Sequence, residues 1–327
     1  MSRNRLFAIV IIVLVLVLSG FPQATQGQTE QPTATPSAPY SLIAFRSYRD
    51  GGAGEIYVMN PDGSDPVNLT NNDLTDIGPR WFGDKGQITF SAFREEQVRL
   101  IFPHIMNADG SDSKLFAFMP LLIDQGFNDV WEIFPSPDGR QILFVIERMS
   151  SDIYLLDLTD PNPEPINITN NPADDDSPDW SPDGSKIAFV SNRSGNREVY
   201  VMDMVNLSEP VNLTQHELID GRPSWSPDGK KLAFISTRDG NPEIYVMDAD
   251  GSNTHRLTNN PAIDGHPDWS PDGNFIVFDT DRNGDSEIYV MDADGSNPTN
   301  VTNNPADDAF PSWSPWLPVE ANPADEE

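Results

Sequence analysis

The stretch Pro223-Ser-Trp-Ser-Pro-Asp-Gly-Lys-Lys-Leu-Ala-Phe-Ile-Ser-Thr-Arg-Asp-Gly-Asn-Pro-Glu-Ile-Tyr-Val-Met-Asp-Ala-Asp-Gly251 decides the fold, because variants of it recur through most of the chain. Its tryptophan returns as Trp81, Trp180, Trp225, Trp269 and Trp313. The last three intervals are 45, 44 and 44 residues, and the interval of 99 between Trp81 and Trp180 spans two periods with extra residues. A period of this length is typical of four-stranded propeller blades.

Each repeat predicts four short strands joined by tight turns. The first strand ends in the Ser-Pro-Asp-Gly turn at 226–229, where Pro and Gly have the backbone preferences that a turn needs. The second strand is of the type at 232–236, the third of the type at 243–247, and the fourth is a short strand near Arg256. Strands joined in this way form an antiparallel meander. Because strands two and three are apolar on both alternating sets, we expect neighbouring blades to cover both faces of each sheet.

The number of units predicts how the ring closes. First strands and fourth strands each occur six times. The chain starts with a second strand at 42–45 and finishes with a first strand at 311–313. The C-terminal strand can therefore complete the blade that the N-terminus begins, which leaves no free sheet edge. The sequence predicts an all-β fold, a six-bladed β-propeller of four-stranded antiparallel blades with one-plus-three ring closure.

The N-terminus is expected to direct export. Two basic residues, Arg3 and Arg5, precede an apolar run of thirteen residues from Leu6 to Leu18. This is the length of a signal peptide and short for a membrane span. We therefore expect the protein in the periplasm or outside the cell, with an uncleaved membrane anchor as the alternative. The predicted segments are a signal peptide at 1–27, a Pro/Thr/Gln-rich linker at 28–40, the propeller at 41–316 and an acidic tail at 317–327.

Composition excludes several classes of partner. The net charge is −31, and such a surface repels nucleic acid and anionic lipid headgroups. The chain has no cysteine, so it forms no disulfide. We expect a monomer that contacts a membrane only if the leader stays uncleaved.

The repeat resembles that of TolB-type propellers. The resemblance rests on Trp-Ser-Pro-Asp-Gly followed by Arg-Asp-Gly-Asn-x-Glu-Ile-Tyr-Val-Met-Asp-Ala-Asp-Gly, and it covers roughly residues 41–316. It implies a six-bladed propeller from a bacterial periplasmic family that acts in a cell-envelope complex. The chain departs from TolB itself in lacking the α/β domain that precedes the propeller there. The same repeat is similar to propellers of prolyl-oligopeptidase-like peptidases, but no Gly-x-Ser-x-Gly motif is present.

Two charged positions recur at the end of the ring opposite the Ser-Pro-Asp-Gly turns. An Asp lies five residues before the Trp, and an Arg follows each second strand. The positions are Asp76, Asp175, Asp220, Asp264 and Asp308, with Asp129 one place out of register, and Arg49, Arg94, Arg148, Arg193, Arg238 and Arg282. One interpretation is a carboxylate ring that holds a cation. The interpretation that we favour is a repeated structural Asp–Arg pair, because both charges recur equally.

A position that varies among otherwise equivalent units is a better candidate for specificity. Three residues before the Trp stand Gly78, Ser177, Arg222, His266 and Phe310. We hypothesise that Arg222, His266 and Phe310 line a partner-binding surface at the channel mouth. The alternative is ordinary surface variation.

A second candidate site is a calcium loop between two strands of the last repeat. Asp279, Asp281, Asn283 and Glu287 could supply the oxygen ligands that calcium prefers. Calcium is therefore the one cofactor that the sequence suggests. Against it, Glu287 is also the standard Glu of the repeat, and Arg282 interrupts the acidic residues.

The second unit is irregular. Residues 115–134 carry about seven extra residues and are mostly apolar. Such an insertion is either a lid or docking patch, or a locally buried plug.

The predicted function is that of an exported, non-catalytic propeller that binds a protein, peptide or glycan of the cell envelope. The first alternative is a metal-dependent propeller enzyme of the lyase or lactonase type. The second is a calcium-stabilised structural surface protein.

Overall fold

The computed structural model describes residues 39–83, 86–94, 101–127, 130–147 and 150–318. The chain divides into two units, Met1–Ala34 and Thr35–Glu327, and all described residues belong to the second. The predicted signal peptide, nearly all of the linker and residues 319–327 of the predicted tail lie outside the described residues, as do Asp129 and Arg148.

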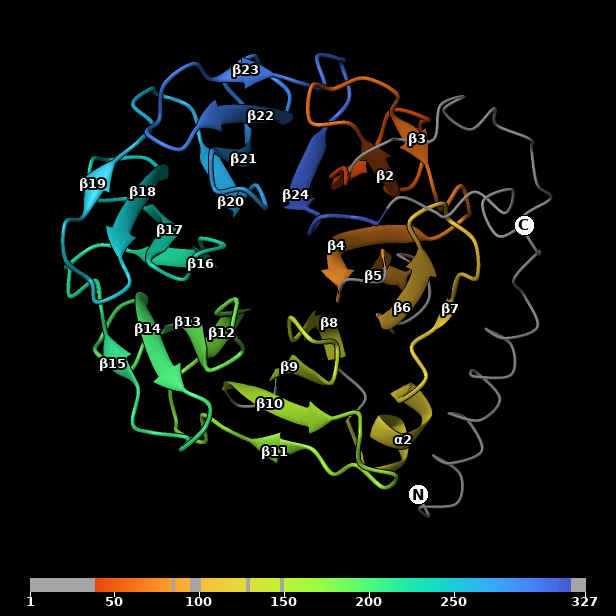
Figure 1. The fold of residues 1–327 in the computed structure, drawn as a ribbon, viewed down its shortest axis with the longest axis vertical. Coiled ribbons are helices and arrows are strands. Elements are labelled where there is room, and N and C mark those ends of the chain that lie inside the picture. Colours follow the sequence, from red (N-terminus) through yellow and green to blue (C-terminus); the bar gives the residue numbers. More distant parts are fainter. Residues whose placement is uncertain (1–38, 84–85, 95–100, 128–129, 148–149, 319–327) are drawn as a thin grey trace, which may run out of the picture. The chain divides into compact units, whose positions relative to one another are not determined.

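Six four-stranded antiparallel sheets stand around a central channel (Figure 1). We number them as blades in chain order. Blade 1 contains β24 (Asp308–Trp313), β1 (Ile43–Ser47), β2 (Glu55–Met59) and β3 (Val67–Asn68); blade 2 contains β4 (Thr75–Phe82), β5 (Gln87–Phe93), β6 (Phe102–Asn107) and β7 (Lys114–Leu115); blade 3 contains β8 (Val130–Pro135), β9 (Gln141–Glu147), β10 (Ser151–Asp157) and β11 (Ile166–Asn167). Blade 4 contains β12 (Asp175–Trp180), β13 (Lys186–Ser191), β14 (Glu198–Asp203) and β15 (Val211–Asn212); blade 5 contains β16 (Asp220–Trp225), β17 (Lys231–Ser236), β18 (Glu243–Asp248) and β19 (His255–Arg256); blade 6 contains β20 (Asp264–Trp269), β21 (Phe275–Thr280), β22 (Glu287–Asp292) and β23 (Thr299–Asn300).

The ring closes through strands from both ends of the chain. Strand β24 pairs antiparallel with β1, and Ile43 lies opposite Trp313 in the register. Blade 1 thus takes one strand from the C-terminal part and three from the N-terminal part. The predicted six-bladed architecture and its one-plus-three closure are confirmed.

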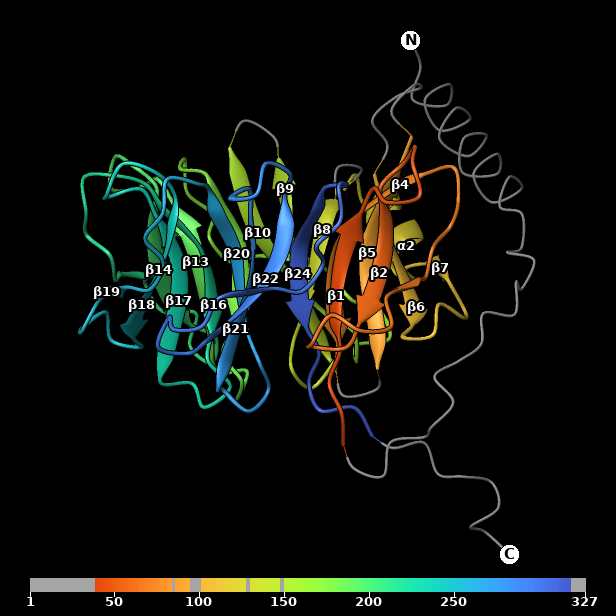
Figure 2. The same cartoon turned by 90° about the horizontal axis from the view of Figure 1, so that it is seen from above.

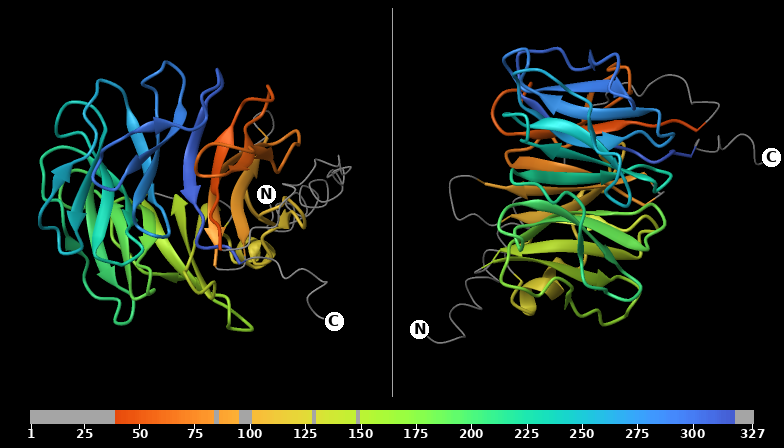
Figure 3. Two further views of the ribbon diagram at one scale, coloured as in Figure 1. Left: turned by 45° about the horizontal axis from the view of Figure 1, so that its top comes forward. Right: turned by 90° about the vertical axis from the view of Figure 1, so that its left-hand side faces the viewer.

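The core is divided among the spaces between neighbouring blades. Between blades 4 and 5, for example, Ala188 and Val199 pack against Trp225, Phe234 and Met247. Equivalent clusters lie between the other pairs of neighbours. Both faces of each sheet are covered, as the continuous apolar runs of the second and third strands predict. Figures 2 and 3 show the blades side by side, with their strands crossing between the two ends of the ring.

The repeated tryptophan also connects neighbouring blades by hydrogen bonds. The indole Nε1 of Trp180 in blade 4 donates to the backbone oxygen of Phe134 in blade 3 at 3.0 Å. Trp269 donates in the same way to Ser224 O at 3.2 Å. Trp81 donates likewise to Ser312 O, so three of the five repeated tryptophans bond to the neighbouring sheet and stabilise the contact between blades.

The irregular segment after blade 2 forms a short helix, α2 (Met119–Asp124). Phe116, Met119 and Leu122 are buried in the cluster between blades 2 and 3. The insertion therefore fills the space between these blades.

Among the described residues, no helix is both long enough and apolar enough to cross a membrane.

Candidate functional site

The innermost strand of most blades carries a β-bulge with a residue in the left-handed region. In blade 5 the register between β16 and β17 shifts between Gly221 and Ser224. The bulge residue there is Arg222, with a φ of 49°. The position three residues before the Trp has the same conformation in four other blades, with φ of 61° at Gly78, 50° at Ser177, 48° at His266 and 58° at Phe310. The varying position that the sequence singles out is thus a conformationally special one.

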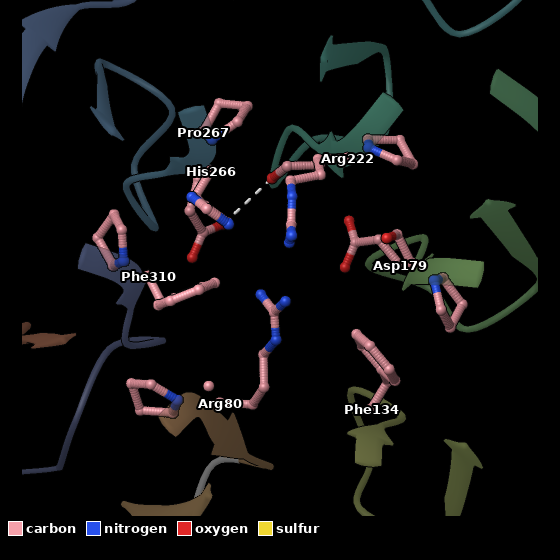
Figure 4. Close-up of a pocket in the computed structure, with 15 residues that line it drawn as sticks. Arg80, Phe134, Asp179, Arg222, His266, Pro267 and Phe310 are labelled. Carbon is pink, nitrogen blue, oxygen red and sulfur yellow. Dashed lines mark hydrogen bonds between the residues drawn. The ribbon is translucent and has the colours of Figure 1, made fainter. Parts of the chain in front are cut away.

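These bulge residues line one pocket in the central channel (Figure 4). Its free volume is about 40 Å³. This is room for about three water molecules, at roughly 10–15 Å³ each. The lining residues are 78–80, Phe134, 177–179, 222–224, 266–268 and 310–311, so all six blades contribute.

Arg80 enters the pocket from blade 2 and is held by an acid of blade 3. Its Nε lies 2.9 Å from Oε1 of Glu132. A Cβ at position 78 would lie 3.1 Å from the same oxygen, so Gly78 leaves room for the Glu132 side chain. Glu132 occupies the position of the bulge residue in the irregular blade. Burial works to lower the pKa of Arg80, but Glu132, Asp268 and Asp179 outweigh it and raise that pKa.

Arg222 enters from blade 5 and has no such acid. Its guanidinium makes no hydrogen bond or ion pair within the described residues. The guanidinium carbon lies 5.9 Å from the centroid of the Phe310 ring, a weak cation–π contact. Burial lowers the pKa of Arg222, Glu132 opposes this, and the charge of Arg80 lowers it further.

His266 and Phe310 are placed by one buried carboxylate, that of Asp279. Nδ1 of His266 lies 2.7 Å from Asp279 Oδ2, and the backbone N–H of Phe310 donates to the same oxygen at 2.9 Å. The two rings pack with their centroids 4.3 Å apart. Burial works to raise the pKa of Asp279, but the imidazole and the Phe310 N–H hold it below the usual value. Burial lowers the pKa of His266, and the charge of Asp279 opposes this.

Two further carboxyl groups reach the pocket from the position directly before the Trp. Asp179 accepts the backbone N–H of Trp225 at 2.7 Å, and Asp268 accepts that of Trp313 at 2.7 Å. Burial raises the pKa of Asp179 to about 7, and the nearby Asp268 adds to this. Burial also raises the pKa of Asp268. These two side chains join blade 4 to blade 5 and blade 6 to blade 1, and both line the pocket.

Among the described residues, four of the recurrent Asp residues form an ion pair with a recurrent Arg, and a fifth, Asp76, does not. Arg193 lies 3.0 Å from Asp175, Arg238 3.0 Å from Asp220, Arg282 3.0 Å from Asp264, and Arg49 2.9 Å from Asp308. Each of these Asp side chains is fully buried. Asp76 is buried as well, but Arg94 is exposed and forms no ion pair with it. Burial accordingly raises the pKa of Asp76 to about 7.

The four candidate calcium ligands bind to different partners. Asp279 holds His266 and Phe310, whereas Asp281 accepts the backbone N–H of Ile263 at 2.8 Å. Asn283 donates to the Tyr289 hydroxyl at 2.7 Å. Glu287 accepts the backbone N–H of Asn304 at 3.0 Å and the hydroxyl of Thr302. In the part of the chain that the structure describes, no three His, Cys, Asp or Glu side chains gather as a metal site.

The sequence reasoning placed Arg222, His266 and Phe310 together, and they line one pocket. It missed Arg80, Glu132, Asp179 and Asp268. Glu132 stands at the bulge position of the irregular unit, and the other three stand at a second varying position, the one before the Trp, which reads Arg80, Phe134, Asp179, Ser224, Asp268 and Ser312. Because alternate residues of a strand face the same side, this position shares the channel face.

Comparison with known proteins assigns the family. The sequence profile of the TolB beta propeller domain matches residues 133–217 and 208–316, together more than half of the 327 residues. The chain belongs to the TolB β-propeller family. A curated member, the Tol-Pal system protein TolB of Desulfosudis oleivorans, is 33% identical over 82 residues. That match covers 25% of this chain and 18% of the length of the relative. The predicted TolB-like resemblance is confirmed.

Solved structures show how widely the TolB-type fold is shared. TolB from Acinetobacter baumannii superposes with a TM-score of 0.72 at 23% identity, over 86% of this chain and 69% of that one. A putative TolB from Agrobacterium tumefaciens gives 0.60 at 22% identity, over 81% and 89%. A chain of a nidogen/laminin complex gives 0.63 at 9% identity, over 85% and 100%. At these identities the likeness shows the fold alone.

Proposed function

We propose that this protein is an exported TolB-like propeller that binds a protein or peptide of the cell envelope at the mouth of its central channel, without catalysing a reaction. The observation that carries the proposal is the set of side chains at the bulge position. Framework positions repeat from blade to blade, whereas this position reads Gly78, Glu132, Ser177, Arg222, His266 and Phe310. Four different side chains at this position, those of Ser177, Arg222, His266 and Phe310, line one pocket and are suited to recognising one shape.

Backbone strain supports a role for these side chains. A left-handed conformation costs roughly 1–2 kcal/mol for a residue that has a Cβ, and glycine avoids this cost. Only blade 2 has glycine at the bulge, whereas Ser177, Arg222, His266 and Phe310 keep a side chain there. Strain that is retained where a simple replacement would remove it points to a use for the side chain.

The size of the pocket favours one narrow group of a larger partner. The free volume of about 40 Å³ is too small for a sugar ring or a folded peptide segment. The remaining contacts of a protein or peptide would therefore lie on the loops around the mouth. The curated relative named as a Tol-Pal system protein supports a partner in the cell envelope.

The burial of the His266–Asp279 pair favours binding over catalysis. His266 and Asp279 resemble the imidazole and orienting carboxylate of a general base. Both imidazole nitrogens, however, are buried from solvent. The Phe310 ring packs against the imidazole, and a substrate would have to displace groups around the ring nitrogens to exchange a proton with them.

The test is a capture assay, in which the exported protein is incubated with an envelope extract of cells that carry this protein. We compare the proteins captured by wild type with those captured by the Arg222→Ala/His266→Ala double variant. The matched control is Arg140→Ala/His255→Ala, which removes the same two residue types from exposed positions outside the pocket. We expect the pocket variant to lose a captured protein that the control retains. Equal capture by all three proteins would refute a binding role for the mouth.

A further inference from the structure

We propose that Arg222 binds a single carboxylate that is inserted into the central pocket. The carboxylate would come from an acidic side chain or from the C-terminus of the partner. This inference rests on the proposed function, because it names the group that the partner inserts.

Arg222 is a binding group without a partner of its own. Arginine in a folded protein is charged and presents its N–H donors in a fixed fork that matches a carboxylate. Four recurrent arginines of the repeat, Arg49, Arg193, Arg238 and Arg282, are bound to buried Asp residues. The guanidinium of Arg222 lines the pocket and makes no ion pair or hydrogen bond with any described residue. An anion in the pocket would supply the missing acceptors.

A second arginine faces Arg222 across the channel. Arg80 lies in blade 2 and Arg222 in blade 5, which are opposite one another in a ring of six. Figure 4 shows the two side chains directed toward each other within the pocket. Two cations that face one space repel each other, as the lowering of the Arg222 pKa by Arg80 reflects. An anion between them removes this repulsion.

The acids around the pocket do not replace such an anion, because each already has donors. Glu132 binds Arg80, and Asp279 binds His266 and the Phe310 N–H. Asp179 and Asp268 accept the N–H groups of Trp225 and Trp313, respectively. The Glu132 and Asp279 charges remain close enough to act on Arg222. They repel a doubly charged anion about twice as strongly as a singly charged one.

The walls beside Arg222 favour a carboxylate at the end of a carbon chain. Phe310 and the prolines 79, 178, 223, 267 and 311 are among the residues that line the pocket and can contact carbon groups beside the polar side chains. Planar, singly charged and small, a carboxylate satisfies the guanidinium fork within the free volume of about 40 Å³. The CH₂ groups that precede it in Glu, Asp or a C-terminal residue would contact these walls.

Three small peptides test whether the purified, exported protein binds a carboxylate at Arg222. Acetyl-Gly-Glu-Gly-amide carries only a side-chain carboxylate, and acetyl-Gly-Gln-Gly with a free C-terminus carries only a terminal one. Acetyl-Gly-Gln-Gly-amide carries neither. Binding is followed through the Nε–Hε NMR signal of Arg222 in protein labelled with ¹⁵N-arginine, the signal being assigned as the one that Arg222→Gln removes. The affinity of each peptide is measured by titration calorimetry with wild type, Arg222→Gln and Arg140→Gln. The last variant removes an exposed charge outside the pocket.

We expect at least one carboxylate peptide to shift the Arg222 signal and the amide peptide to leave it unchanged. Arg222→Gln should weaken binding about tenfold or more, while Arg140→Gln should not. The tighter of the two carboxylate peptides identifies the source of the group. The inference is wrong if the neutral peptide binds equally, if no peptide moves the Arg222 signal, or if Arg222→Gln binds as wild type does.

These results are separable from those of the capture assay. If capture depends on Arg222 and His266 but no carboxylate binds, the proposed function stands and the ligand class is wrong. If a carboxylate binds at Arg222 and capture is unaffected by the double variant, the anion site stands and the proposed function is wrong.

Discussion

Arg49 lies two residues after strand β1, and Asp308 is the first residue of strand β24. Nη2 of Arg49 donates a hydrogen bond of 2.9 Å to Oδ2 of Asp308. In blades 4, 5 and 6 the same pair joins residues only 18 positions apart. In blade 1 it joins residues 259 positions apart. The pair that joins strands within blades 4, 5 and 6 therefore also closes the ring in blade 1.

Breaking this pair should destabilise the protein strongly. Asp308 is fully buried and the Arg49 side chain is 19% exposed. Asp308→Ala leaves the guanidinium without its carboxylate, and we expect the free energy of unfolding to fall by about 3 kcal/mol in urea titrations. The control is Asp228→Ala, which breaks the exposed pair with Lys230 and should cost less than about 1 kcal/mol. Similar losses in the two variants would contradict the role of the buried pair.

The unpaired Asp76 should make stability depend on pH. Its pKa is raised from an ordinary 3.8 to about 7, mainly by burial. Between these values the folded state holds a proton that the unfolded state releases, so this group's stabilisation is complete below about pH 4 and is lost as the pH rises through 7. Asp76→Asn should remove that loss, so that its free energy of unfolding gains on the order of 4 kcal/mol over wild type at pH 8 relative to pH 4.

Urea titrations from pH 4 to 8 measure this difference. The exposed Asp73→Asn is the control, and it should keep the wild-type profile. An Asp76→Asn profile parallel to that of wild type would show that Asp76 does not carry the effect.

Relieving strain at a bulge should stabilise the fold. Ser177 has a φ of 50°, which glycine adopts without a Cβ clash. We expect Ser177→Gly to raise the free energy of unfolding by about 1 kcal/mol, and Ser177→Ala to give no such gain, because alanine keeps the Cβ. If Ser177→Gly does not raise the free energy of unfolding, the side chains at the bulge cause no backbone strain, and strain then gives no support to a function for them.

Calcium should have little effect on stability. Asp279, Asp281, Asn283 and Glu287 are bound to separate partners, so gathering them around one ion would break existing hydrogen bonds. We expect the melting temperature in millimolar calcium to match that in a chelator. A stabilisation that disappears in Asp281→Ala would establish a calcium site there and favour the calcium-dependent alternatives.

The repeat made the fold predictable. Each strand of the blade occurs six times and the Ser-Pro-Asp-Gly turn four times, so a weak signal in one unit, such as the missing Trp at Pro135, is corrected by its equivalents. The Asp–Arg pairs could be expected for the same reason, since two charges that recur equally at one end of the ring have the same geometry in each blade. Helix α2 could not be expected from the sequence, because the insertion occurs once and its apolar residues show no period that distinguishes a helix from a loop.

The candidate site was predictable only in part. Variation at the bulge position led to Arg222, His266 and Phe310, but a bulge is not visible in the sequence, and neither was the left-handed backbone that it requires. The carboxylate that places His266 and Phe310 belongs to Asp279, which the sequence suggested as a calcium ligand instead. A contact between strands of neighbouring blades depends on the packing of the ring, and no local pattern encodes it.

Photo-crosslinking from the pocket tests the central claim most directly. Benzoylphenylalanine replaces Phe310 in the pocket or, as an aromatic control, the exposed Phe275 beside the 270–273 turn. The purified proteins are irradiated with an envelope extract of cells that carry them. The account predicts a discrete crosslinked protein from position 310 that is absent from position 275 and is lost when Arg222→Ala is added. The same product from both positions, or one that persists without Arg222, would contradict it.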